Sequence, residues 1–328
     1  MTSEADTSRF RLGRFAPSTS GRAHPGTLLA ALLCWLDARS VGADVLLRLE
    51  DLDRARTKEG YREGLRADLE WFGLDWDSEQ TQSDASERHA ERIAEWVRAG
   101  RVYACECSRA QIRAVAALAP DGSRAYPGTC RGRRVTIDDW READVTLRLE
   151  LEPSQIDLED EGGARIAGDP AGLFGDPILR RRDGAYAYHF VSVVDDAAAG
   201  VDRVVRGRDL LPSTLVQVAL QQDLGLKTPR YRHHALLLES RDDKLSKLHG
   251  AVDVRALRDF YDPGALCGAL AHFVGLAPRD TRCAPQELVS GFDWSTVSSD
   301  DVVLSWSTAA GLCEVERVVA SGGSHQGD

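Results

Sequence analysis

Long apolar runs are missing from this 328-residue sequence. The longest, at 28–36, is far shorter than the roughly 20 residues that a bilayer-spanning helix needs. The first ten residues are polar and charged, and they contain no apolar core of a secretory signal peptide. We therefore expect a cytoplasmic protein that does not contact a membrane, and we expect it to be a monomer.

Positive charge is also scarce. The chain has 41 basic and 52 acidic residues, a net charge of −11, which argues against a general nucleic-acid-binding protein. Only four of the basic residues are lysines, leaving 37 arginines. The 43% hydrophobic and 28% charged composition is that of a globular protein, and the length suits two domains or one domain with a large insertion.

Cysteine is present in an odd number without regular spacing. In a chain without a signal peptide, such residues are expected to be reduced thiols or metal ligands. The seven are Cys34, Cys105, Cys107, Cys130, Cys267, Cys283 and Cys313. The sequence also lacks the GxxxxGK[ST] pattern, so it does not support a P-loop mechanism of nucleotide binding.

The most informative stretch spans 14–27, where a strand end is followed by a turn rich in Pro, Ser and Gly. Leucines at helical spacing follow in 28–36, so a helix is predicted to begin between His24 and Thr27. The first turn of a helix presents unpaired N–H groups and the positive end of its dipole. There His24 can hydrogen-bond a phosphate, and Gly26 allows close approach to the backbone.

A second stretch, 242–248, contains Lys244 and Lys247, half of the lysines in the chain. An ammonium differs from a guanidinium in reach and hydration, which suggests that this loop requires lysine. A solvated turn is the alternative for an isolated Lys-x-x-Lys. The presence of the His24 stretch favours a functional loop.

Strand and helix patterns alternate along the chain and predict a parallel, doubly wound α/β sheet. Glu50, Asp51 and Asp53 follow the strand predicted at 45–49. Ligands of such sheets bind beyond the carboxyl ends of the strands, so these carboxylates could meet a cationic group, although an ordinary polar loop is the alternative. The range 186–196 is predicted to be another buried strand.

The pattern changes after residue 100. Cys105, Cys107 and Cys130 lie within 26 residues and predict a structural zinc site, although three buried free thiols are the alternative. The range 101–134 has seven arginines but only two acidic residues, so it is the best candidate for contacting an RNA backbone.

These motifs resemble those of the class I aminoacyl-tRNA synthetases. Residues 24–27 are similar to their His-x-Gly-His signature, and residues 244–248 to their Lys-Met-Ser-Lys-Ser loop. Residues 14–18 and 48–53 are typical of the glutamyl branch. Within it the sequence most resembles the short paralogs, the glutamyl-queuosine tRNA(Asp) synthetases. The resemblance extends from about residue 11 to about residue 248.

The sequence departs from the family pattern at a few positions. Thr19 and Ser20 stand where the family usually has Pro followed by Thr or Ser. Pro25 fills the variable position of the His motif, where the start of a helix tolerates it. Thr27 replaces the last histidine of that motif, and the short paralogs often have Ser or Thr there.

The resemblance implies a class I catalytic domain of the Rossmann type, divided into 1–100 and 176–250. It places an insertion with the zinc site at 101–175, similar to an acceptor-binding domain. After it we expect a short helical C-terminal region at 251–328 that ends in a disordered tail. Only 80 residues follow residue 248, too few for the large helical anticodon-binding region of a glutamyl-tRNA synthetase.

The resemblance also implies roles for individual residues. His24, Lys244 and Lys247 would be catalytic, with His24 and Lys247 forming a cationic clamp. ATP, carrying Mg²⁺, would be bound by His24, Gly26, Thr27 and Lys247. Glutamate would be bound by Arg14, Phe15, Ala16, Pro17, Ser18, Glu50, Tyr188 and Arg206. Tyr126 would be the fourth zinc ligand beside Cys105, Cys107 and Cys130.

Within the glutamate site, the resemblance places Glu50 at the amino group and Arg206 at a carboxylate, which a guanidinium can bind bidentately. By sequence alone Tyr188 could equally be a core aromatic residue, and Arg206 could lie in a surface turn. His233 and His234 are expected at a strand start without a metal.

The implied function is activation of L-glutamate by ATP without tRNA, followed by transfer to queuosine in tRNA(Asp). Glutamyl-tRNA synthetases, in contrast, need tRNA for activation. One alternative is an atypical enzyme of that kind, which charges the tRNA 3′ end. The other is a non-catalytic paralog that binds RNA.

Overall fold

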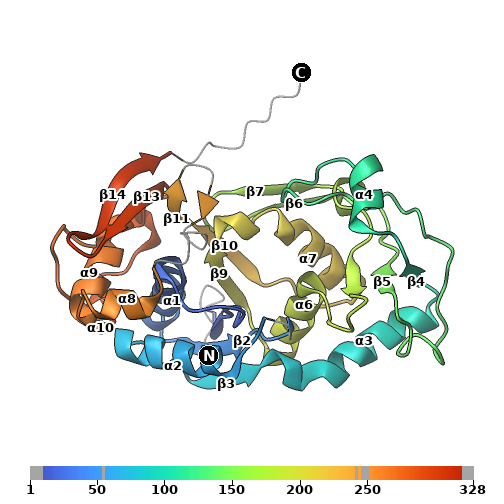
Figure 1. The fold of residues 1–328 in the computed structure, drawn as a ribbon, viewed down its shortest axis with the longest axis horizontal. Helices are drawn as coiled ribbons and strands as arrows, with labels where there is room; N and C mark the ends of the chain where they lie inside the picture. The colour runs from blue at the N-terminus through green and yellow to red at the C-terminus, as the bar shows by residue number, and fades with distance from the viewer. Residues whose placement is uncertain (1–9, 54–55, 241–242, 245–251, 320–328) are drawn as a thin grey trace, which may run out of the picture.

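The computed structural model describes residues 10–53, 56–240, 243–244 and 252–319 (Figure 1). The described helices are α1 (Pro25–Ser40), α2 (Glu59–Phe72), α3 (Ser86–Arg98), α4 (Arg109–Val115), α5 (Pro170–Leu173), α6 (Tyr188–Ala199), α7 (Ser213–Asp223), α8 (Val254–Arg258), α9 (Pro263–Phe273) and α10 (Pro285–Val289). Short 3₁₀ turns are η1 (Gln82–Ala85), η2 (Arg208–Leu210) and η4 (Trp294–Thr296).

The described strands form four sheets. They are β1 (Leu12–Phe15), β2 (Asp44–Leu49), β3 (Ser78–Thr81), β4 (Val102–Cys105), β5 (Thr146–Leu149), β6 (Ile156–Glu159), β7 (Arg165–Gly168), β8 (Ile178–Arg180), β9 (Arg203–Gly207), β10 (Arg230–His234), β11 (Leu237–Ser240), β12 (Asp243–Lys244), β13 (Asp301–Ser307) and β14 (Gly311–Val318).

The central sheet has five parallel strands in the order β10-β9-β1-β2-β3. The strand order reverses between β1 and β9, which pair through Gly13 and Arg203. Such a reversal opens a crevice at the carboxyl ends of the strands, where doubly wound folds bind their ligands. The predicted parallel, Rossmann-type sheet is confirmed.

Alternating side chains of β2 build a core on each face of this sheet. Val45, Leu47 and Leu49 pack with α1, α2 and α9 in one core. Leu46 faces the other core, formed with α3, α6 and α7. Because successive side chains of a strand point to opposite faces, Arg48 lies on the same face as Leu46. It is completely buried.

The strand predicted at 186–196 is wrong, because most of this range forms α6. The helix packs against α3 and α7, and residues 190–196 are all buried. A helix that is buried on most sides lacks a clear apolar stripe, and its β-branched and aromatic residues imitate a buried strand. Gly200, in the left-handed conformation with φ 74°, ends it as a C-cap, a signal that the sequence analysis missed.

The insertion is built on the antiparallel sheet β4-β5-β8 and the separate hairpin β6-β7. In Figure 1 it lies on the opposite side of the central sheet from the C-terminal elements. Strand β8 begins at Ile178, so this small sheet extends beyond the boundary expected at 175. The turn of the β6-β7 hairpin follows Glu159, the last residue of β6.

The C-terminal region is only partly helical. Helices α8, α9 and α10 agree with the helical region expected at 251–328, but residues 301–318 form the hairpin β13-β14 instead of helices. Strand β13 pairs with β11 and so joins this hairpin to the strand that precedes the lysine loop, the stretch 242–248 that contains Lys244 and Lys247. The expected disordered tail at 321–328 lies outside the described residues.

Candidate active site

His24 is the N-cap of α1 and is held by a reciprocal pair of hydrogen bonds. Its Nδ1 accepts from the backbone N–H of Thr27 at 3.3 Å, and Thr27 Oγ1 accepts from the His24 N–H at 3.3 Å. Gly26 leaves room for the ring, because a Cβ there would lie 3.1 Å from His24 Cε1 and would push the imidazole aside. Thr27 and Gly26 thus fix the position of the imidazole ring.

The His24 ring is neutral rather than cationic. Burial lowers its pKa to about 4. Since Nδ1 accepts a hydrogen bond, the single ring proton lies on Nε2, which can donate to a ligand. The expectation that His24 contributes positive charge is therefore not met. It can contribute a hydrogen bond at the helix N-terminus.

A cavity of about 290 Å³ lies beside this helix start. His24 and Gly26 line it from α1, and Gly207, His234 and Leu236 line it from the ends of β9 and β10. Because α1 follows β1, whereas β9 and β10 lie on the other side of the sheet reversal, the cavity occupies the crevice expected to hold a nucleotide.

A buried cluster of charges lies on the α6 face of the sheet. Arg48 Nη1 is 2.5 Å from Asp196 Oδ1, and Arg14 Nε donates to the same carboxylate at 3.3 Å. Arg48 Nη2 lies 3.7 Å from Glu50 Oε1. Burial alone would raise the pKa of Asp196, but the Arg48 and Arg14 guanidiniums hold it below its usual range. The cluster joins β1, β2 and α6.

At Glu50, in contrast to Asp196, the effect of burial on the pKa outweighs that of the neighbouring guanidiniums. The Glu50 side chain is 12% exposed, and burial raises its pKa to about 7 in spite of Arg48 and Arg14. A carboxylate in such a setting gains from a cationic ligand, because an ammonium would compensate the charge that burial disfavours. Glu50 is therefore suited to an amino group.

The loop after β1 is joined to Glu50. The backbone N–H of Glu50 donates to the Pro17 carbonyl at 3.0 Å, and Thr19 donates to the Glu50 carbonyl. Ser18 forms a parallel bridge with Glu50 and is exposed. Phe15 packs against the core around α1. Its side chain is thus directed away from Arg14, since adjacent residues of β1 face opposite sides.

The structure places the other predicted site residues as follows. Ala16 is half-buried between β1 and the loop, and Tyr188 is the first residue of α6, also half-buried. Arg206 is buried in β9 and donates to Gln217 and Thr214 of α7. The surface-turn alternative for Arg206 is therefore wrong.

The lysine loop is only partly described. Lys244 lies in β12, where its backbone pairs with Leu238 of β11. Lys247 lies outside the described residues. Arg48 and Asp196 are not among the residues predicted to form the site. An arginine inside an otherwise apolar strand was the available signal for Arg48.

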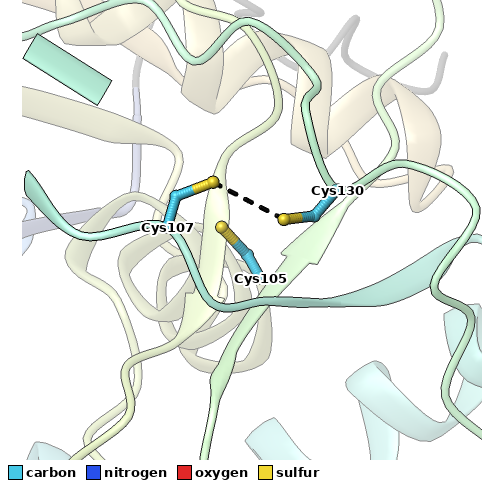
Figure 2. A group of neighbouring side chains, drawn as sticks. All are labelled: Cys105, Cys107 and Cys130. Atoms are coloured by element: carbon cyan, nitrogen blue, oxygen red, sulfur yellow. Dashed lines mark hydrogen bonds between the residues drawn. The ribbon is translucent and has the colours of Figure 1, made fainter. Parts of the chain in front are cut away.

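Four potential metal ligands converge in the insertion. The sulfurs of Cys105, Cys107 and Cys130 lie within 4.8 Å of one another, and Figure 2 shows them pointing toward a common centre. Tyr126 Oη lies 3.3 Å from Cys105 Sγ and 3.8 Å from Cys107 Sγ. Sulfurs on one tetrahedral zinc are about 3.8 Å apart, so this donor set fits zinc.

Ion pairs partly neutralise the arginine-rich range 101–134, which contains the cysteine cluster. Four of its seven arginines form ion pairs, namely Arg101 with Asp223, Arg131 with Asp176, Arg133 with Glu106 and Arg134 with Glu150. Arg109 and Arg113 are exposed on α4. The surface that can contact an RNA backbone is thus narrower than the arginine count indicates.

Fold and site agree with a known family. The chain belongs to the class I tRNA synthetases (E and Q), whose catalytic domain matches residues 12–300. It is therefore a ligase of the aminoacyl-tRNA synthetase type. None of the described helices has the length and apolar character to span a membrane.

Curated relatives narrow the family. The glutamyl-Q tRNA(Asp) synthetase of Symbiobacterium thermophilum is 40% identical over 92% of this chain and 98% of its own length. That of Nocardia farcinica is 41% identical over 89% of this chain and 93% of its own length. The resemblance to the glutamyl-queuosine paralogs is thereby confirmed.

A glutamate–tRNA ligase of Cereibacter sphaeroides is 36% identical over 86% of this chain and 65% of its own length. Among solved structures, a glutamate tRNA ligase of Elizabethkingia meningosepticum in complex with its amino acid shares the fold. Its TM-score is 0.71 at 24% identity, covering 89% of this chain and 66% of that one.

Proposed function

We propose that the protein activates L-glutamate with ATP and transfers it to the queuosine base at the wobble position of tRNA(Asp). The observation that carries the first half is the charge cluster of Arg14, Arg48, Asp196 and Glu50 at the carboxyl ends of β1 and β2. It offers a carboxylate for an amino group. Arg206, on the next strand, offers a cation for a carboxylate.

In the first step the α-carboxylate oxygen of glutamate attacks the α-phosphorus of ATP. The bond to pyrophosphate breaks, and glutamyl-adenylate and pyrophosphate form. Such a step depends on positioning and on stabilising the developing charge. Glu50 would bind the ammonium and Arg206 a carboxylate, while Arg14, Ser18 and Tyr188 would enclose the substrate.

The nucleotide would occupy the cavity beside α1. His24 would donate its Nε2 proton to a phosphate oxygen at the helix N-terminus, where the backbone dipole also favours negative charge. Since His24 is neutral, we assign the positive charge of the clamp to Lys247, together with Lys244. Mg²⁺ would arrive with ATP and neutralise phosphate charge.

In the second step a hydroxyl of the acceptor attacks the carbonyl of the adenylate, and AMP leaves. The names of the relatives in Symbiobacterium and Nocardia support queuosine in tRNA(Asp) as the acceptor. We assign the RNA contact to Arg109 and Arg113 of α4. Zinc, held by the three cysteines and Tyr126, would fold this insertion and take no part in the reaction.

The acceptor is tested with labelled glutamate and two forms of one tRNA(Asp), carrying queuosine or guanosine at the wobble position. We expect label only in the queuosine form, retained after the 3′ end is removed. Equal labelling of both forms, or labelling of the 3′ end of tRNA(Glu), would instead support the charging enzyme. Absence of label from every tRNA would favour the RNA-binding alternative.

A further inference from the structure

Neutral acceptors surround the buried guanidinium of Arg206. Its Nη1 donates to Gln217 Oε1 at 2.7 Å, and its Nη2 to Thr214 Oγ1 at 2.7 Å and to the Leu210 carbonyl at 3.3 Å. Its Nε donates to His233 Nε2 at 3.2 Å. Among the described residues no carboxylate forms an ion pair with it, so its charge is available to a substrate carboxylate.

The bond from Arg206 to His233 requires one tautomer of the imidazole. His233 Nδ1 lies 2.9 Å from Asp160 Oδ2, and a carboxylate can only accept, so Nδ1 carries the proton. Burial lowers the pKa of His233 although Asp160 opposes this, so the ring is neutral. Its Nε2 therefore carries a lone pair. That lone pair meets Arg206 Nε–H and also lies 3.2 Å from the Thr214 hydroxyl.

Asp160 is itself fixed by the backbone around it. Its Oδ1 accepts from the N–H groups of Gly162 and Ala164 at 2.8 and 2.9 Å, and its Oδ2 also accepts from the His233 N–H at 2.9 Å. The carboxylate is buried, and these hydrogen bonds lower its pKa against the effect of burial. Asp160 thus presents a fixed acceptor to the imidazole.

The hairpin turn that carries Asp160 belongs to the insertion. It lies between β6 and β7 and is attached to the edge of the central sheet, where Glu161 N–H donates to the Tyr231 carbonyl at 2.8 Å. Glu161 also forms an ion pair with Arg203 of β9. The insertion therefore contacts β9, the strand that carries Arg206. It does so through a hairpin that is distant in the sequence from the cysteine cluster of the insertion.

We infer that Asp160 and His233 are positioning residues, which orient the Arg206 guanidinium toward a substrate carboxylate through a chain of two hydrogen bonds. The β6-β7 hairpin thereby completes the carboxylate subsite of the central sheet. This inference rests on the proposed function, in which Arg206 binds glutamate. The competing role for the pair is to attach the hairpin to β10 without any effect on the substrate.

Two substitutions of His233 separate these roles. In His233→Gln the amide oxygen can take the place of Nε2 and accept from Arg206, whereas the link to Asp160 is lost. In His233→Asn the amide can take the place of Nδ1 and donate to Asp160, whereas the acceptor for Arg206 is lost. Asp160→Asn leaves the ring in place but favours the tautomer with the proton on Nε2, which faces the Arg206 N–H.

The readouts are glutamate KM and ATP KM in ATP–pyrophosphate exchange, together with thermal unfolding. We expect His233→Asn and Asp160→Asn to raise glutamate KM by about tenfold, as for loss of a buried hydrogen bond to a charged group. ATP KM should stay unchanged. His233→Gln should keep glutamate KM within about threefold of the parent, because the acceptor for Arg206 is restored.

The inference is overturned if His233→Asn keeps the parental glutamate KM, or if His233→Gln is as impaired as His233→Asn. NMR of the imidazole nitrogens tests it independently of substrate, since His233 must be protonated at Nδ1 alone, and the opposite tautomer would contradict it. A parent protein that shows no glutamate-dependent exchange would instead refute the proposed function, and the tautomer would still be measured.

Discussion

The guanidinium of Arg48 lies 2.5 Å from the carboxylate of Asp196, although the two residues are 148 positions apart. The Arg48 side chain is completely buried, and the Asp196 side chain is nearly so. The pair joins β2 to α6, and Arg48 Nη2 also lies 3.7 Å from Glu50 Oε1. The position of Glu50, where we propose that the amino group of glutamate binds, therefore depends on a charged contact inside the core.

Substitution of Asp196 should affect both stability and substrate binding. Asp196→Asn leaves Arg48 and Arg14 without their shared counter-charge, so unfolding free energy should fall by about 3–5 kcal/mol. Glutamate KM should rise by at least about tenfold, because Arg14 loses its fixed position. Chemical denaturation and exchange kinetics measure the two effects.

The matched control for that variant is Asp157→Asn. It removes a carboxylate from the exposed pair of Asp157 with Arg165, and exposed ion pairs contribute little. Both stability and glutamate KM should remain parental. An Asp196→Asn protein that behaves like this control would show that the buried cluster has no part in the site.

Glutamate binding should depend on pH through Glu50. Its pKa is raised to about 7, and only the carboxylate form can pair with the substrate ammonium. Glutamate affinity should therefore increase as pH rises through about 7 and level off above it. The pKa of Glu50 is higher in the folded protein than the ordinary pKa of a glutamate. Its contribution to stability therefore falls as the pH rises from that ordinary pKa toward 7.

Calorimetric titration with glutamate between pH 5.5 and 8.5 would measure this profile. His24 should not contribute to it, since its pKa of about 4 lies below that range. In Glu50→Gln the step near pH 7 should disappear and binding should be weak throughout. A profile that persists in Glu50→Gln would assign the titration to another group.

The capping and ligand-binding roles of His24 can be separated by His24→Asn. Asparagine is a good N-cap, so helix α1 should lose no more than about 0.5 kcal/mol of stability. It cannot place a donor where Nε2–H lies, so the exchange rate should fall by about a hundredfold. Thermal unfolding and exchange kinetics decide this. Equal activity of the variant and the parent would exclude a hydrogen bond from His24 in the reaction.

Zinc content provides a test of the insertion. We expect one zinc per chain by elemental analysis, lost in Cys130→Ser together with part of the thermal stability, since structural zinc contributes directly to folding. Cys313→Ser is the control, because Cys313 lies in β14 outside the cluster. A parent protein purified without zinc, and unaffected in stability by a chelator, would favour three free thiols.

Much of the catalytic fold could be predicted from sequence because its elements are amphipathic or well capped. The start of α1 falls at His24 as expected, where the His24 side chain caps the helix and Pro25 occupies its first turn. Helix α6 was missed because it is buried on most sides, and its β-branched and aromatic residues imitate a strand. The hairpin β13-β14 was missed because pairing with β11 is not encoded locally.

The candidate site, like the fold, could be predicted only in part from the sequence. Motif residues such as His24 and Glu50 could be found by resemblance; in the structure His24 ends the loop that follows β1, and Glu50 is hydrogen-bonded to that loop. The contacts of Asp196 with Arg48 and of Asp160 with His233 are formed by residues far apart in the sequence. A single sequence does not reveal such contacts, because they depend on how helices and hairpins pack on the sheet.

ATP–pyrophosphate exchange measures the tRNA-independent activation of glutamate that we propose. The assay is run with glutamate in the absence of tRNA and again with tRNA added, with aspartate in place of glutamate as the specificity control. We predict exchange with glutamate alone, and none with aspartate. Exchange that requires tRNA, or none under any condition, would contradict this account.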